Sequence, residues 1–285
     1  MFYLVDKPLG ITSFDVLRQM RKILNIRKMG HTGTLDPLAT WLLLVATGNS
    51  TKLIIELTKV AKRYRFTVQL DGKTPSLDWG TVVEKIDTSN SLLRSAEELV
   101  IFLASQTKQV PPKYSALHIG GERAYKLIQS GQEFELDERN IEVKDVEIHE
   151  YLPPEKVEIS LTISSGWYIR SLAPIIGIFF WIPGGYITQL RRTDIYLNNG
   201  ITLSEDTACT LENISSLPYS YIFPTIHTID ISEQRYTDLL NGKSITPDDS
   251  YGWQIWEKYF LKYDDHFLSL CQFDGEKMII IRNHV

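Results

Sequence analysis

One short segment of the chain, residues 30–40, places a carboxylic acid among residues that force the backbone to turn. Asp36 lies directly before Pro37 and three residues after Gly33. Because proline disfavours the helical conformation of the residue before it, we expect Asp36 on a stiff, extended turn. An aspartate with the ordinary pKa of about 3.9 is ionised at pH 7 and can act as a nucleophile. The alternative is an Asx turn, in which the carboxylate only stabilises the loop.

The sequence of this loop is similar to a known family motif. Residues 30–37, Gly-His-Thr-Gly-x-Leu-Asp-Pro, resemble the catalytic loop of the TruB family, the bacterial tRNA pseudouridine-55 synthases. Further segments resemble motifs of that family in the same order along the chain, and the resemblance covers roughly residues 2–194. These segments are Lys7–Ser13, Gly48–Lys52, Lys62–Tyr64, Gln109–Ala116, Gly121–Tyr125, Ser165–Leu172 and Leu190–Thr193.

The resemblance implies conversion of the T-loop uridine of tRNA, position 55 in tRNA numbering, to pseudouridine. That isomerisation breaks the N-glycosidic bond, rotates the uracil and joins the ribose to C5. It involves no redox change and needs neither a metal nor an organic cofactor. Asp36 would be the nucleophile, adding either on the ribose C1′ side after elimination or to the uracil ring, and both routes stay open. The uridine must first be flipped out of the RNA loop, at a cost of a few kcal/mol.

The same resemblance assigns roles to further residues. A carboxylate in a closed pocket needs a positive partner, because burial disfavours its charged form. Arg170 matches the arginine that pairs with the catalytic aspartate, and a lysine could not offer its planar fork. Tyr64 would stack on the flipped uracil and assist the loss of the C5 proton. The substrate-binding positions are Tyr168 and Leu190 in the wall of the site, His31 against the RNA where the uridine has left, and Lys7.

The distribution of charge favours an RNA partner more than the total charge does. The formal net charge is −5 and the sequence pI is about 5.7, which by themselves argue against nucleic acid. Residues 1–72, however, carry eleven lysines and arginines and five acids, so this part has a net charge of +6. Such a surface can face phosphates, and a plain solvated face is the alternative. The candidates for phosphate contact are Lys7, Lys22, Lys28, Arg63 and Arg192.

Local patterns predict an α+β fold, because strands and helices mix without regular βαβ alternation. We expect the pseudouridine-synthase fold that the resemblance implies, with a mixed, largely antiparallel central sheet and flanking helices. Thr12 or Ser13 can cap a helix that ends near Leu24 and has Phe14 on its apolar stripe. Residues 29–40 are expected as a loop. Strands are predicted over residues 2–5, 41–46, 63–70, 141–149, 156–164, 266–273 and 277–282, and helices over 95–105 and 122–129.

A domain boundary is expected where Pro218 and Pro224 precede a short run of strands. We predict a catalytic domain over residues 1–220 and a small β domain over residues 221–285, which is loosely similar to the PUA-like domain of TruB proteins. Cys209 and Cys271 have no metal-ligand spacing and are interpreted as free thiols in a reducing cytosol. Neither a signal peptide nor an apolar run of about 18 residues is apparent, so a cytoplasmic protein is expected. No protein partner is implied, and a monomer is expected.

Three tryptophans occupy positions where the family usually has a small residue. Trp41 and Trp181 occupy positions at or near usual glycines of the family, and Trp167 replaces a small residue. A tryptophan there overpacks a tight site, and it is strained if the backbone needs a positive φ. Either neighbouring side chains have become smaller, or the codons are read as glycine in the source cell. A catalytically impaired module of the same fold that binds or chaperones RNA is therefore the alternative function.

Overall fold

The computed structural model describes residues 1–197, 200–241, 243, 245, 252–264 and 266–283. Its main element is an eight-stranded sheet in the order β1-β3-β13-β4-β12-β11, with β2 added to β3 and β14 to β13. β13 runs parallel to β3 and the other neighbours are antiparallel, which confirms the mixed, largely antiparallel sheet. The strands are β1 (Phe2–Lys7), β2 (Met29–His31), β3 (Ala39–Thr47), β4 (Ala61–Gln69), β11 (Val143–Leu152), β12 (Lys156–Ile163), β13 (Tyr186–Tyr196) and β14 (Thr202–Leu203).

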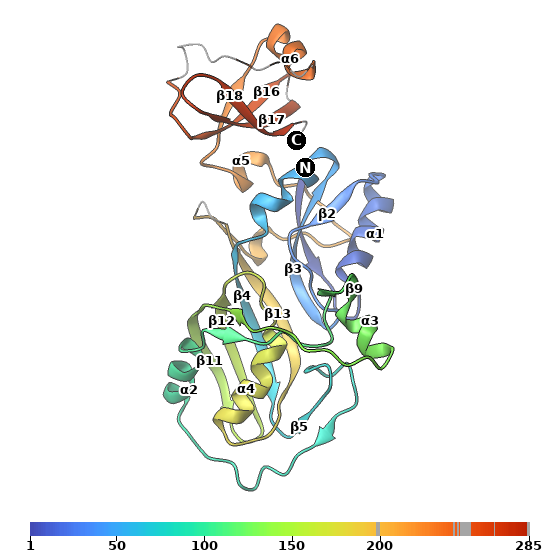
Figure 1. The fold of residues 1–285 in the computed structure, drawn as a ribbon, viewed down its shortest axis with the longest axis vertical. Coiled ribbons are helices and arrows are strands. Elements are labelled where there is room, and N and C mark those ends of the chain that lie inside the picture. Colours follow the sequence, from blue (N-terminus) through green and yellow to red (C-terminus); the bar gives the residue numbers. More distant parts are fainter. Residues whose placement is uncertain (198–199, 242, 244, 246–251, 265, 284–285) are drawn as a thin grey trace.

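Helices flank this sheet, as expected for an α+β fold. α2 and α4 lie against the lower half of the sheet in Figure 1, where the rings of Phe102 and Phe179 pack with centroids 5.0 Å apart. α1 lies beside β2 and β3. The helices of this part are α1 (Ser13–Leu24), α2 (Ala96–Ala104), α3 (Ala124–Gln129) and α4 (Leu172–Phe179), with the 3₁₀ segments η1 (Gly48–Leu57), η2 (Ile169–Ser171) and η3 (Glu205–Thr207).

Short two-stranded pieces occupy the connections between these elements. They are β5 (Gly72–Lys73) with β6 (Glu84–Lys85), β7 (Lys108–Gln109) with β10 (Arg139–Asn140), and β8 (His118–Ile119) with β9 (Glu122–Arg123). Two of the short strands correct the sequence prediction. Residues 29–31 form β2 within the expected loop, and Glu122 and Arg123 belong to β9, so the predicted helix begins only at Ala124.

Alternation along β4 explains how this strand reaches the site. Lys62, Tyr64 and Phe66 point to one face and are buried, whereas Arg65 points to the other and is exposed. Arg65 donates to Glu158 on the neighbouring strand β12 over 2.7 Å. The period of two therefore directs Lys62, Tyr64 and Phe66 of β4, two of them polar, into the interior of this part of the chain.

Helix α1 begins where the sequence predicted, but one residue predicted on its apolar face is exposed. Thr12 is the N-cap, and Thr12 and Asp15 form a reciprocal capping box. Phe14, predicted on the apolar stripe, is 55% exposed, which is a correction. Arg18 and Arg21 lie over its ring at 5.8 and 5.2 Å from the centroid. The Phe14 ring is therefore covered by two arginines of the basic face and is not packed in the apolar core.

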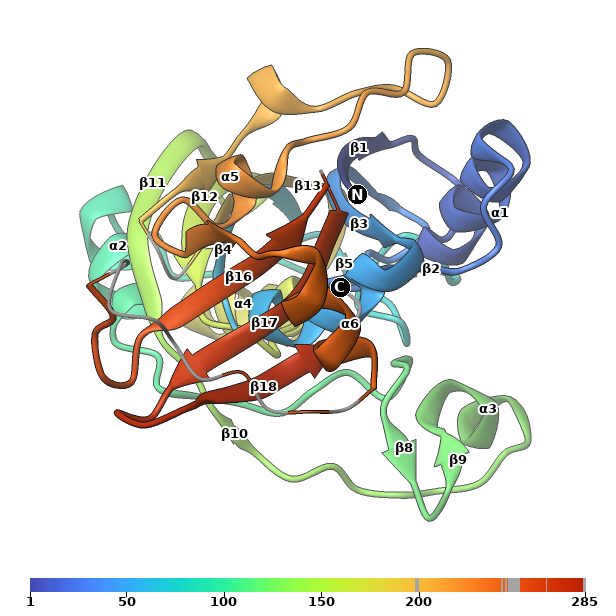
Figure 2. The ribbon, with the colours of Figure 1, turned by 90° about the horizontal axis from the view of Figure 1, so that it is seen from above.

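The C-terminal part forms its own sheet, shown from above in Figure 2. Its order is β15-β16-β17-β18, with strands β15 (His227–Asp230), β16 (Lys258–Tyr263), β17 (His266–Phe273) and β18 (Met278–Asn283) and helix α6 (Glu233–Leu240). Helix α5 (Tyr219–Ile222) precedes it. Phe260 and Leu270 of this sheet join Phe2 and Leu4 of β1 in one apolar cluster. A C-terminal sheet domain is thus confirmed, while its PUA-like character and the 220/221 boundary stay predictions.

Three of the six tryptophans adopt positive φ, a backbone region that favours glycine. The φ angles are +84° at Trp41, +59° at Trp181 and +68° at Trp256. Trp41 is also crowded, because the guanidinium carbon of Arg191 lies only 2.7 Å from its ring centre, inside the usual carbon–carbon contact of about 3.5 Å. Its indole Nε1 is buried without a hydrogen-bond partner among the described residues. These backbones favour the hypothesis that glycine occupies such positions in the native protein, which stays a prediction.

Trp181 occupies the position after helix α4 where glycine is most favoured. Its N–H donates to the Ile178 carbonyl over 3.0 Å, and the Ile182 N–H donates to the Gly177 carbonyl over 2.8 Å. These two bonds define a Schellman motif with Trp181 in the left-handed position. Since a side chain there costs roughly 1–2 kcal/mol and Trp181 is 69% exposed, little burial opposes a change to glycine.

We therefore expect Trp181→Gly to increase the free energy of unfolding by about 1 kcal/mol, measured by urea denaturation. The matched control is Trp79→Gly, because Trp79 is 49% exposed and has no positive φ. This control should lower stability, since glycine loses more conformational entropy on folding. Equal losses in both variants would contradict the glycine assignment. Mass spectrometry of native protein that finds tryptophan at position 41 would contradict the codon hypothesis.

Candidate active site

The loop that carries Asp36 is held by the N-terminal segment of the chain. Ser13 Oγ accepts a hydrogen bond from the Leu35 N–H over 2.8 Å and donates to the Leu35 carbonyl over 3.1 Å. The Lys7 ammonium donates to the Pro37 carbonyl over 3.3 Å, and the Gly10 N–H donates to the same oxygen over 2.9 Å. The segment from β1 to the first turn of α1 therefore fixes the backbone on both sides of the aspartate.

Asp36 and Arg170 form a bidentate ion pair. Arg170 Nε donates to Asp36 Oδ2 over 2.8 Å, and Nη2 donates to Oδ1 over 3.1 Å. The Arg170 side chain is 5% exposed, whereas 30% of the Asp36 side chain is exposed. This parallel pairing is the strong geometry of a guanidinium with a carboxylate. It leaves the aspartate accessible while its partner is buried.

The remaining donors of Arg170 reach other segments. Nη1 donates to the Ser76 carbonyl over 2.8 Å, and Nη2 also donates to the Tyr114 carbonyl over 2.9 Å. Asp78 Oδ2 lies 3.6 Å from Nε, so a second carboxylate faces the guanidinium. Asp78 is oriented by Ser76 Oγ and by the Gly80 N–H, both of which donate to its Oδ1. Sequence reasoning did not single out Asp78, because nothing in its local pattern shows that residues 76–80 fold over Arg170.

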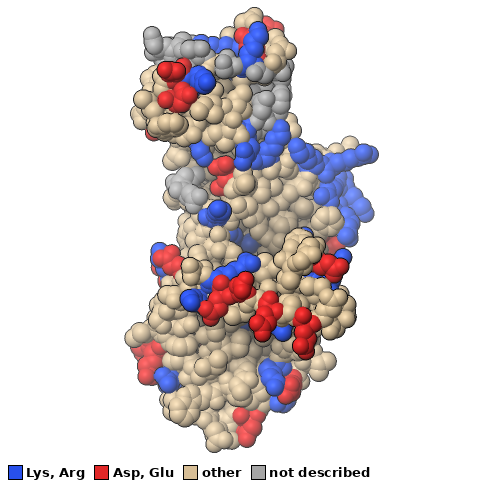
Figure 3. All heavy atoms as spheres, in the orientation of Figure 1, with Lys and Arg blue, Asp and Glu red and all other residues tan. Residues whose placement is uncertain are grey.

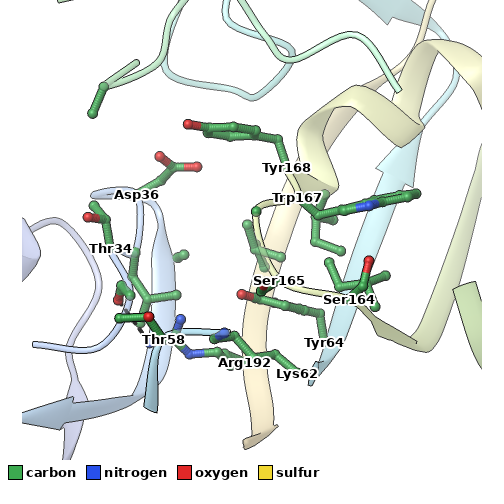
Figure 4. Close-up of a pocket in the computed structure, with 18 of the residues that line it drawn as sticks. Thr34, Asp36, Thr58, Lys62, Tyr64, Ser164, Ser165, Trp167, Tyr168 and Arg192 are labelled. Atoms are coloured by element: carbon green, nitrogen blue, oxygen red, sulfur yellow. Dashed lines mark hydrogen bonds between the residues drawn. The ribbon is translucent and has the colours of Figure 1, made fainter. Parts of the chain in front are cut away.

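A pocket of about 390 Å³ opens beside Asp36. Tyr64 on β4, Leu190 on β13 and Tyr168 line it together with the aspartate, so four of the predicted site residues meet here. Figure 4 shows Asp36 and Tyr168 at one end, and Lys62, Arg192 and Thr58 at the other. Burial, and after it the negative charge of Asp36, raises the pKa of the Tyr168 hydroxyl. Tyr168 is therefore a neutral hydrogen-bonding group near the carboxylate.

The backbone of Tyr168 is positioned by Gln109, a residue that the sequence placed only within a motif. Gln109 Nε2 donates to the Tyr168 carbonyl over 2.8 Å, and the Tyr168 N–H donates to Gln109 Oε1 over 3.1 Å. Gln109 is buried, so both amide groups need these partners. The segment that begins with β7 thus fixes the chain just before Arg170.

Three predicted site residues do not line the pocket: Arg170, which lies behind Asp36, and also Lys7 and His31. Lys7 is fully buried, and its ammonium donates to the carbonyls of Pro8, Ile11 and Pro37. Burial lowers its pKa to about 8, with the charge of Asp36 acting in the opposite direction. The structure therefore gives Lys7 a role in holding the loop, not in contacting a phosphate. His31 lies half-buried on β2, and burial and then Arg192 lower the pKa of its ring.

The other phosphate candidates divide into exposed and engaged residues. Lys22 and Lys28 are exposed on the basic side of α1 and β2, which appears blue at the upper right of Figure 3. Arg63 pairs with Glu147 over 2.7 Å and donates to the Asp145 carbonyl. Arg192 is 1% exposed, which contradicts a place on the surface. Its side chain lies instead at the inner end of the pocket (Figure 4).

Comparisons with known proteins agree with this arrangement. Residues 21–169 match the model of the family described as TruB family pseudouridylate synthase, N-terminal domain. The chain is 36% identical over 247 residues to tRNA pseudouridine synthase B of Aquifex aeolicus, a match that covers 85% of each protein. The chain belongs to the TruB family of pseudouridylate synthases. A similar relative of that name in Ehrlichia ruminantium is 31% identical, over 87% of this chain and 86% of the relative.

Solved structures support the fold of this TruB family member. A chain of the structure titled "Crystal Structure of a Cbf5-Nop10-Gar1 Complex" superimposes with a TM-score of 0.64 at 19% sequence identity. The match covers all of this chain and 84% of that chain. Within the described residues, no helix has the length and apolar character to cross a membrane, and no group of three His, Cys, Asp or Glu side chains could hold a metal ion.

The buried guanidinium of Arg170 gives a prediction for stability. Arg170→Lys should lower the free energy of unfolding by roughly 2–4 kcal/mol, because an ammonium cannot reach two carboxylates and two carbonyls at once. The control is Arg65→Lys, since the Arg65–Glu158 pair is partly exposed and should contribute less than about 1 kcal/mol. Urea denaturation of both variants measures the difference. Similar small losses would show that the guanidinium is not what connects these segments.

Proposed function

We propose that this protein isomerises the T-loop uridine of tRNA, at position 55, to pseudouridine, with Asp36 as the nucleophile. The observation that carries the proposal is the ion pair of Asp36 with Arg170 at a pocket lined by Tyr64, Tyr168 and Leu190. An accessible carboxylate held by a buried cation is the arrangement that nucleophilic catalysis requires. The names of the relatives, tRNA pseudouridine synthase B, support tRNA as the substrate.

The chemistry asks little of the protein beyond positioning and charge. The N1–C1′ bond of the uridine breaks, the uracil turns, and C5 bonds to C1′. The C5 proton leaves and N1 gains a proton, so atoms and electrons balance without an added reactant. The two parallel hydrogen bonds from Arg170 fix the orientation of the Asp36 carboxylate. Attack on C1′ and addition to the ring are both compatible with this placement.

The aromatic walls provide the binding energy that base flipping needs. Tyr64 is 9% exposed and lines the pocket from β4, opposite Arg192 of the neighbouring strand β13, and Leu190 of β13 also lines the pocket. The pocket therefore offers an aromatic and an aliphatic surface to a planar base. Tyr168 offers a neutral hydroxyl near the carboxylate. Stacking and hydrogen bonds of this kind offset the few kcal/mol lost when the base leaves its stack.

The tryptophan positions bear on the alternative of an impaired RNA-binding module. Trp167 lines the pocket, and its indole Nε1 is buried without a partner in the described chain. Trp41 is not among the described residues that line the pocket; it lies against Arg191 and the apolar cluster behind the sheet. Only Trp167 can therefore obstruct the substrate directly. RNA binding without turnover by the wild type would favour the impaired module.

Asp36→Asn gives the direct test of the reaction. We expect pseudouridine formation to fall by at least about 10³-fold, because the amide has nearly the same shape but no nucleophilic oxygen. The assay follows release of tritium from C5 of the uridine in a T-arm stem-loop RNA. RNA affinity, measured by filter binding, should change little, because the variant keeps the pocket walls.

Asp87→Asn is the matched control for this experiment. Asp87 does not line the pocket and accepts a hydrogen bond from the Ser89 N–H, which an asparagine oxygen can also accept. Its activity should equal that of the wild type. Tritium release by Asp36→Asn at the wild-type rate would exclude Asp36 as the nucleophile.

The basic surface on α1 gives a prediction for RNA affinity. If Lys22 and Lys28 contact phosphates, the affinity for the stem-loop should fall linearly with salt on logarithmic axes. Lys22→Gln and Lys28→Gln should each reduce the slope by about 1. An unchanged slope in both variants, measured between 50 and 200 mM salt as a typical range, would show that the RNA binds elsewhere.

A further inference from the structure

The exposed ring of Phe14 on helix α1 lies against two arginines of the same helix. The ring is 55% exposed, and the guanidinium carbons of Arg18 and Arg21 lie 5.8 and 5.2 Å from its centroid. Their spacing along the helix puts the three side chains in one row on its surface. Because a guanidinium is attracted to the face of an aromatic ring, Phe14 restricts where the two arginines lie. The ring therefore orders two cations at the surface of the protein.

Most cations of this region have no acidic partner. Arg18 pairs with Asp15 over 2.7 Å, and Arg21 Nε donates to a backbone carbonyl over 3.0 Å, which leaves its Nη atoms free to bind a ligand. Within the described chain, four cations here form no ion pair with a carboxylate: Arg21, Lys22, Arg27 and Lys28. Figure 3 shows this region as a blue area at the upper right, whereas blue and red atoms are mixed over the lower half of the same view. The surface of α1 is therefore suited to an anionic partner.

The row begins beside the loop that carries Asp36. Ser13, the first residue of α1, is hydrogen-bonded to Leu35, which directly precedes Asp36. Leu17 of α1 packs in the same apolar cluster as Tyr64 of the pocket, so the helix and the pocket lie on one face of the sheet. From the loop, the 12 residues of the helix extend over about 18 Å. A polyanion that enters the pocket can therefore continue along α1.

We infer that Phe14, Arg18 and Arg21 form a docking site for the sugar-phosphate backbone of the RNA outside the pocket, with Phe14 as a positioning residue for the two guanidinium groups. The inference rests on the proposed function, because it takes RNA as the partner. It goes beyond the exposed lysines of α1 by giving the aromatic ring a role. The planar fork of a guanidinium can donate to two phosphate oxygens at once, and its geometry depends on how the side chain is held. Continuity with the pocket favours RNA over an acidic protein as the occupant.

The test is a mutational cycle in the Asp36→Asn background, in which the RNA is not converted. Affinity for an unmodified tRNA transcript is measured by filter binding at several salt concentrations. We expect Arg18→Gln together with Arg21→Gln to weaken binding about tenfold and to reduce the salt slope by about 2. Phe14→Leu should weaken binding about threefold, because the cation–π attraction that orders the arginines is lost.

The cycle and a conservative variant distinguish positioning from other roles of the ring. In the variant that lacks both arginines, Phe14→Leu should cause no further loss, because the ring acts through them. Phe14→Tyr keeps an aromatic ring and should bind RNA as the parent does. An equal loss from Phe14→Leu with and without the arginines would show that the ring binds RNA by itself, and would overturn the positioning role.

Arg65→Gln is the matched control for removal of an arginine. Arg65 is exposed on the opposite face of the central sheet, where it pairs with Glu158. This variant should bind RNA as the parent does. An equal loss of affinity in Arg65→Gln, or no loss on removal of Arg18 and Arg21, would overturn the docking site. The second outcome would point to an acidic protein as the partner of this row.

The design also separates a failed docking site from an unfolded variant and from a failed reaction. More than half of the Phe14 ring is exposed, so the melting temperature of Phe14→Leu should stay within about 2 °C of that of the parent. A larger drop would show that the ring is structural and would overturn the inference. If the wild type forms pseudouridine but the arginine variant binds RNA normally, only the docking site is wrong. If the cycle behaves as expected without turnover by the wild type, the docking site stands and the proposed reaction fails.

Discussion

The bidentate contact of Arg170 with Asp36 is the interaction on which the rest of the site depends. Arginine is not deprotonated in proteins, and a buried charge without partners is unfavourable. A buried guanidinium must therefore be surrounded by hydrogen-bond acceptors. The chain surrounds Arg170 with the carboxylate of Asp36, the carbonyls of Ser76 and Tyr114, and the nearby carboxylate of Asp78. These groups come from segments that are far apart in the sequence. One side chain therefore both connects these segments and fixes the orientation of the carboxylate, before any substrate binds.

The polarity of the pocket follows from the three central strands. β3 begins just after the Asp36 loop, while β4 and β13 direct Tyr64, Lys62, Leu190 and Arg192 to the same side of the sheet. Asp36 and Tyr168 lie at one end of the pocket, and Tyr64 lies with the cations Lys62 and Arg192 at the other (Figure 4). The pocket therefore carries opposite charges at its two ends.

The strained tryptophans are separate from this machinery. Trp41 and Trp181 have positive φ, but one lies behind the sheet against Arg191 and the other at the exposed end of α4. Their strain bears on the stability of the fold, because neither side chain meets the Asp36–Arg170 pair among the described contacts. The positive φ angles at these tryptophans therefore indicate positions that suit glycine.

The sequence by itself determined the elements and the centre of the site. Alternation and capping patterns predicted β4, β12, α1 and α2 closely, because such patterns reflect contacts within a few residues. The motifs identified Asp36, Arg170, Tyr64, Tyr168 and Leu190, which the fold brings together. Only the tertiary structure decided that Lys7 and Arg192 are buried, that Phe14 is exposed and that Asp78 faces Arg170. Burial of a charged side chain depends on carbonyls and strands supplied from distant parts of the chain, and no local pattern records them.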